Sequence, residues 1–81
     1  MSKEDEMIQQ VLDAYFQFRR PLPENGYAQE LKTTLDIQEE LAPMAIVKMD
    51  VILQYMGSHD YNMTTDLDGS VKWAIWRLAG T

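Results

Sequence analysis

Three residue types used by serine hydrolases follow one another at Ser58-His59-Asp60. A catalytic triad needs side chains that meet in space with defined geometry, and three consecutive residues do not supply that geometry. His59 is the only histidine and the chain has no cysteine, so a metal site would lack a second imidazole and any thiolate. The sequence therefore predicts no catalytic residue, no metal ligand and no cofactor, and we expect a protein that is not an enzyme.

Asp66-Leu67-Asp68-Gly69 has part of the spacing of an EF-hand calcium loop. With Gly69 at the sixth loop position, Thr64 falls at the first and Ile75 at the twelfth. An EF-hand places an acidic or amide ligand at the first position and a glutamate at the twelfth, so the ligand set fails. Asp68-Gly69 instead indicates the tight turn of a β-hairpin.

Apolar and aromatic side chains are the better candidates for function. Trp73 and Trp76 lie in a segment with strand character, where residues three apart point to opposite faces. At least one tryptophan should then lie outside the core, where it either contacts a partner or packs over the N-terminal helix. Methionine suits adaptable contact surfaces as well as ordinary cores, and the chain has six. The candidate partner-binding residues are Met44, Ile46, Val47, Trp73 and Trp76.

The charge of the chain argues against nucleic acid. Seven basic and thirteen acidic side chains give a net charge of -6. Most of the affinity for DNA comes from basic side chains on phosphates, so this chain would repel a duplex unless its bases cluster. Five bases would have to share one face for DNA binding: Lys48, Lys72, Arg77, Arg19 and Arg20.

The first predicted element is a helix over residues 3–19. Apolar residues recur at helical spacing from Met7 to Phe16, and Ser2 with Asp5 resembles a capping box. Acidic residues occupy the first turn, Arg19 and Arg20 the last, and Pro21 ends the helix.

Residues 27–56 predict a helical region. One interpretation is a short helix over 27–33 and a second over 37–42 capped by Asp36; the other is a single helix over 27–42. Pro43 favours a turn followed by a helix from Met44 to Met56, with Gly57 as its left-handed cap.

Residues 60–79 predict a hairpin. Apolar and polar residues alternate from Tyr61 to Leu67, and β-branched and aromatic residues follow from Val71 to Leu78. The alternative is a C-terminal helix capped by Ser70, because Val71, Ala74, Ile75 and Leu78 also have helical spacing.

Three segments carry a likeness to a known family: Thr34–Ala42, Leu53–Gly57 and Asp68–Leu78. They resemble the capped helix, the end of the recognition helix and the wing of a winged helix-turn-helix domain, over about residues 27–79. The resemblance implies DNA binding, yet Pro43 to Val47 stand where such domains expose base-reading polar residues.

We therefore expect one winged-helix-like domain over residues 1–81, of α+β class but mainly α: three to four helices followed by a C-terminal β-hairpin. We expect an acidic module that acts through protein–protein contacts or as a homodimer. The alternatives are a DNA-binding transcription regulator and an acidic decoy of a DNA-binding protein. A polar, acidic N-terminus and the lack of cysteine favour a cytoplasmic protein without a membrane segment.

Overall fold

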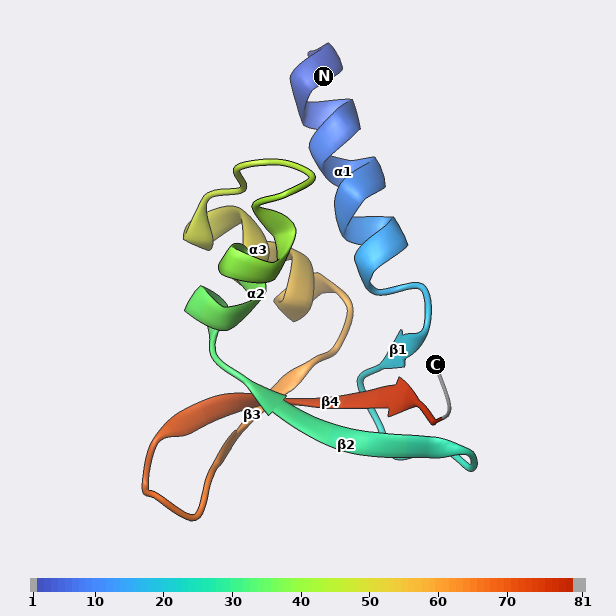
Figure 1. Ribbon diagram of the computed structural model, residues 1–81, viewed down its shortest axis with the longest axis vertical. Coiled ribbons are helices and arrows are strands. Elements are labelled where there is room, and N and C mark those ends of the chain that lie inside the picture. The colour runs from blue at the N-terminus through green and yellow to red at the C-terminus, as the bar shows by residue number, and fades with distance from the viewer. Residues whose placement is uncertain (1, 80–81) are drawn as a thin grey trace.

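The computed structural model describes residues 2–79, which form three helices and four strands (Figure 1). The helices gather on one side of the sheet and the strands cross beneath them (Figure 1). In chain order the elements are α1 (Lys3–Tyr15), β1 (Arg19–Arg20), β2 (Tyr27–Lys32), α2 (Thr34–Leu41), α3 (Met49–Ser58), β3 (Asn62–Thr65) and β4 (Val71–Leu78).

The sheet is antiparallel and β4 lies at its centre. On one side β4 pairs with β2, from Tyr27 opposite Leu78 to Lys32 opposite Trp73. On its other side β4 pairs first with β3 and then with β1, which follow one another along the same edge. Each of the other three described strands therefore pairs with β4.

The expected fold class, mainly α with a hairpin at the C-terminus, is wrong. β1 and β2 precede α2 and join the hairpin strands in a four-stranded sheet, so the fold is α+β. Residues 27–32 form a strand instead of a short helix or the first half of a helix over 27–42. Tyr27, Leu31 and Leu35 are spaced by four, which places residues on one face of a strand as well as of a helix. Pairing with β4 decided between the two.

α2 begins earlier than expected, at Thr34. Thr33 is its N-cap and accepts a hydrogen bond from the Asp36 amide at 3.0 Å. The Asp36 carboxylate in turn accepts from the Thr33 amide at 3.0 Å, which completes a capping box. Asp36 is thus the third residue of the helix and not its cap.

α3 begins at Met49, five residues after the predicted start. Residues 44–47 alternate in burial as an extended segment does: Met44 and Ile46 are exposed, while Ala45 is half-buried and Val47 is buried. The Gln38 side chain donates to the Val47 carbonyl at 2.9 Å and holds this segment against α2. Gly57 is not a left-handed cap, because α3 continues to Ser58 and the positive φ of 65° falls at Asp60.

α1 ends at Tyr15 and not at Arg19, although Ser2 caps it as expected, accepting from the Asp5 amide at 3.2 Å. Arg19 and Arg20 leave the helical path because they pair with Arg77 and Trp76 of β4.

At the other end of the chain, the strand interpretation of residues 71–78 is confirmed. Gly69 in the turn has a φ of 87°, as the Asp-Gly pair indicated.

The core lies between the helices and the upper face of the sheet. Phe16 of α1 is central: its ring lies 5.2 Å from those of both Tyr55 and Tyr61. Trp73 and Ile75 of β4 face the same cluster from below. The remaining buried members are Leu12, Ile37, Leu41, Val47, Ile52 and Met56.

Candidate functional site

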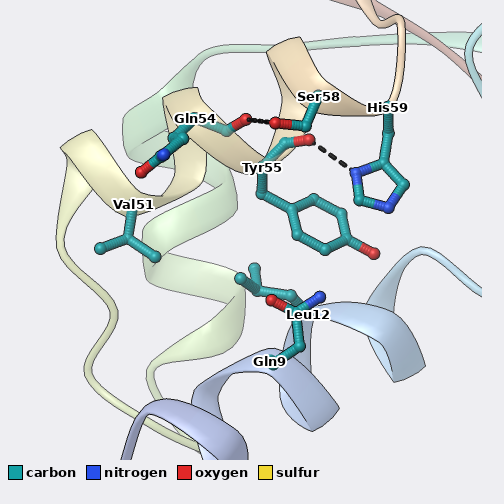
Figure 2. A pocket seen from close by; sticks show the side chains of 7 residues that line it. All are labelled: Gln9, Leu12, Val51, Gln54, Tyr55, Ser58 and His59. Atoms are coloured by element: carbon teal, nitrogen blue, oxygen red, sulfur yellow. Dashed lines mark hydrogen bonds between the residues drawn. The ribbon is translucent and has the colours of Figure 1, made fainter. Parts of the chain in front are cut away.

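A shallow pocket of about 330 Å³ lies between α1 and α3 (Figure 2). Gln9 and Leu12 line it from α1; Val51, Gln54, Tyr55, Ser58 and His59 line it from α3 and its C-cap. The His59 ring stacks on Tyr55 with centroids 4.0 Å apart. The Tyr55 hydroxyl donates to Asp13 at 2.8 Å, and burial together with this bond raises the pKa of Tyr55.

The polar side chains of this pocket are committed to the backbone. The Ser58 hydroxyl donates to the Gln54 carbonyl at 2.8 Å, and His59 Nδ1 lies 2.8 Å from the Tyr55 carbonyl (Figure 2). A carbonyl oxygen only accepts, so Nδ1 carries the proton there. Neither contact joins Ser58 to His59, and the residues that line the pocket include no nucleophile paired with a base.

The acidic turn at Asp66 and Asp68 is satisfied internally. Lys72 Nζ lies 2.6 Å from Asp66, and the hydrogen bond from Lys72 lowers the pKa of that carboxyl. Asp68 accepts from the amide of Ser70 at 2.9 Å and from its hydroxyl at 2.5 Å, contacts that lower the pKa of Asp68. Among the residues that the structure describes, no cluster of His, Cys, Asp and Glu could hold a metal ion.

The five candidate partner-binding residues separate into three places. Met44 and Ile46 project from the segment before α3, with 55% and 79% of their surface exposed. Val47 and Trp73 lie in the core at 0% and 6%, so neither can meet a partner in the folded chain. Trp73 also donates from Nε1 to the Thr34 hydroxyl at 2.9 Å, which ties β4 to α2. Trp76 lies half-buried on the other face of β4.

The face of the sheet away from the helices carries a group of apolar side chains beside the polar Gln29 and Arg20. In the paired registers Trp76 stands beside Gln29, Leu78 beside Tyr27 and Ala74 beside Leu31. Directly opposed residues of antiparallel strands share a face, so these side chains lie together. We call this surface the outer sheet face and define it by Tyr27, Leu31, Ala74, Trp76 and Leu78. The prediction that the two tryptophans lie on opposite faces of β4 is confirmed, with Trp73 on the helix side and Trp76 on the outer sheet face.

A second exposed apolar surface runs along the chain into α3. Met49 and Leu53, one helical turn apart, are exposed and follow directly on Met44 and Ile46. We call these four residues the α3 apolar segment. Sequence reasoning missed Met49 and Leu53 because all the apolar residues of this helix read as one wide surface. The division into a buried face (Ile52, Tyr55, Met56) and an exposed one needs the packing.

The candidate DNA-binding residues do not form a free cationic face. Arg19 and Arg77 face each other across β1 and β4 and share Glu30, at 2.8 and 3.8 Å. Lys72 is paired with Asp66, at the hairpin end of β4.

Arg20 lies on the opposite face from Arg19 and is 3.5 Å from Glu24. Of the five candidates, Lys48 alone forms no ion pair within the described residues. The positive charges of the other four candidates are therefore largely neutralised by neighbouring carboxylates.

No protein-family model, curated protein or solved structure matches this chain. No helix within residues 2–79 is long and apolar enough to cross a membrane.

Proposed function

We propose that this chain is a non-enzymatic, cytoplasmic protein-interaction module of winged-helix type that binds a protein partner through the α3 apolar segment. The observation that carries the proposal is the exposure of four large apolar side chains, Met44, Ile46, Met49 and Leu53, within ten residues of chain. Several exposed large apolar side chains in one short stretch of a small domain indicate an interaction site. The later part of the element order also supports the resemblance, because β2, α2, α3 and the β3–β4 hairpin follow one another; the strand β1 lies between α1 and β2 in addition.

The chemistry around the segment supports a protein partner over a duplex. Lys48 and Asp50 are exposed between Ile46 and Leu53, so the apolar side chains have charges of both signs beside them. Apolar centres with polar margins are typical of protein interfaces. A duplex requires several unpaired cations on one surface, and four of the five candidate bases are already paired with carboxylates. The partner we expect presents an apolar groove or face to the segment.

The experiment places a photo-crosslinking residue at position 46 or at position 67 of the full chain. Leu67 is the matched control, since it is fully exposed but lies in the hairpin turn, away from α3. We expect a defined heteromeric adduct from position 46 that is absent from position 67. Ile46→Asp should abolish binding to the protein so identified, whereas Leu67→Asp should leave it unchanged. Equal adducts from both positions, or unchanged binding by the Ile46→Asp variant, would contradict the proposal.

A fluorescence titration with a short DNA duplex at low salt separates the DNA-binding alternative. We expect no saturable binding, because the net charge is -6 and most bases are paired. Salt-dependent binding that is lost in Lys48→Ala would favour the DNA-binding function instead.

A further inference from the structure

β2 is an edge strand with an open side. It pairs with β4 and, among residues 2–79, with no other strand. Its six residues contain no proline, and the register runs without interruption from Tyr27 to Lys32. An uncovered edge of this length presents unpaired backbone groups on which another strand can be added.

The backbone hydrogen bonds determine which groups point outward. The amide of Ala79 donates to the Gly26 carbonyl at 2.9 Å, so these two residues form a hydrogen-bonded pair one step beyond β2. Such pairs recur at every second residue of an antiparallel ladder, which places Ala28, Glu30 and Lys32 in bonds to β4. Gln29 and Leu31 therefore direct both N–H and C=O away from β4. Tyr27 directs only its carbonyl outward for pairing, since its amide already donates to Glu24 at 3.0 Å.

The charged side chains of β2 do not protect this edge against pairing with another strand. Edge strands are commonly protected by lysines or by inward-pointing charges that a second strand would have to bury. Here Glu30 is held by Arg19 at 2.8 Å, and Lys32 is bound to Glu40 of α2. Both charged side chains are half-buried and paired within the chain. The net charge of β2 is therefore zero, on a molecule whose net charge is -6.

We propose that a second copy of this chain pairs with β2, antiparallel, about a two-fold axis at Gln29. Two strands can pair only if residues whose backbone groups point away from β4 face one another. Of the registers that meet this condition, the one centred on Gln29 pairs every residue from Tyr27 to Leu31. Gln29 then faces Gln29, and Tyr27 of each copy faces Leu31 of the other on the outer sheet face. The pairing makes about four backbone hydrogen bonds and continues the sheet from one copy into the other.

The strand is self-complementary in this register, which favours a second copy over an unrelated peptide. Tyr27 and Leu31 form an aromatic–aliphatic cross-strand pair, a favourable combination, and Ala28 falls opposite Glu30, so no like charges are apposed. Because Thr33 and α2 follow directly on Lys32, the two α2 helices begin at opposite ends of the paired strands. The two outer sheet faces also become one continuous surface, with the two Gln29 side chains at its centre. This association uses β2 and is independent of the α3 apolar segment.

The test uses Gln29→Cys in a chain that has no native cysteine. In a hydrogen-bonded antiparallel pair the facing Cα atoms are about 5.5 Å apart, within the range of a disulfide. Under mild oxidation we expect a covalent homodimer at least about ten times faster than from Leu67→Cys, at a position that is also exposed to solvent. Equal rates for the two variants would overturn the proposal. So would an adduct of Gln29→Cys with another protein while the wild-type chain remains a monomer.

Light scattering and sedimentation of the full chain give the second readout. We expect a concentration-dependent monomer–dimer equilibrium that Gln29→Pro abolishes and Gln29→Ala retains. Proline at position 29 removes an outward N–H and leaves the bonds to β4 in place, and circular dichroism verifies that the variant is folded. A wild-type chain that is monomeric at all concentrations, or a dimer unaffected by a folded Gln29→Pro, would refute the pairing. Ile46→Asp should leave the dimer intact, so this proposal and the proposed function can fail separately.

Discussion

The two faces of β4 carry tryptophans three residues apart in different environments. Trp73 faces the helices, is 6% exposed and donates a hydrogen bond to Thr34. Trp76 lies on the opposite face of β4, directly beside Gln29 and Arg20, and the three helices lie on the other side of the sheet (Figure 1). The first joins the sheet to α2; the second is part of a surface that remains available. Strand periodicity therefore places the two tryptophans on opposite faces, but only the packing of the helices decides which of them is buried.

The largest expected effect tests this contrast directly. Trp73→Ala should lower the free energy of unfolding by about 3–5 kcal/mol, since it removes a buried ring and leaves a cavity. Trp76→Ala should lower it by only about 1 kcal/mol, because a half-buried ring loses less burial. Urea denaturation of both variants measures the difference. Equal losses would show that the two faces contribute alike to stability.

A smaller loss of stability is expected when the N-cap of α2, the helix that Trp73 contacts, is removed. Thr33→Ala removes the hydroxyl that accepts from Asp36 and opens the capping box of α2. We expect a loss of about 1 kcal/mol, the usual effect of removing an N-cap. Thermal denaturation compares this variant with Thr65→Ala, an exposed threonine of β3 that caps no helix. Similar losses in the two variants would contradict a specific role for the cap.

Acid should lower the free energy of unfolding modestly, through two carboxyls of α2, Asp36 and Glu40. The hydrogen bonds to Thr33 hold the pKa of Asp36 below its ordinary value of 3.8. Partial burial raises the pKa of Glu40, but hydrogen bonds from Lys32 and Tyr15 outweigh it, so the pKa lies below the ordinary 4.5.

A carboxyl whose pKa is lower when folded stabilises the fold above its unfolded pKa, and this contribution disappears as the pH falls through the folded pKa. The stability due to these two groups should therefore be constant above about pH 5 and decline below about pH 4. Denaturation at several pH values measures this. The Asp36→Asn, Glu40→Gln double variant should show a flatter decline, and an unchanged profile would count against these two groups.

The smallest perturbation is spectroscopic. Trp73→Phe leaves Trp76 as the single tryptophan, and Trp76→Phe leaves Trp73. Acrylamide should quench Trp76 more strongly than Trp73, and the emission of Trp73 should lie further to the blue. Equal quenching in two folded variants would mean that the outer sheet face is covered in solution.

Some of the fold could be predicted because local chemistry decides it. The Ser2 cap and the amphipathic spacing of α1, and the Asp68-Gly69 turn of the hairpin, are local signals and were predicted correctly. β2 was missed because Tyr27 and Leu31 are four residues apart, a spacing compatible with both periods. The edge at Gln29 went unnoticed for the same reason, since no open edge exists until β2 is known to be a strand.

The candidate sites divide along the same line. Exposed apolar residues at Met44 and Ile46 could be proposed from composition, but the burial of Val47 beside them depends on the extended path that Gln38 helps to hold. The amino-acid sequence on its own determines the net charge, the lack of cysteine and the caps and turns, because these depend on residues close together in the chain. Which tryptophan is buried, which bases are neutralised and which strand edge is open all depend on residues far apart in the chain. Only tertiary pairing with β4 brings those residues together, and it therefore decides where this protein can bind.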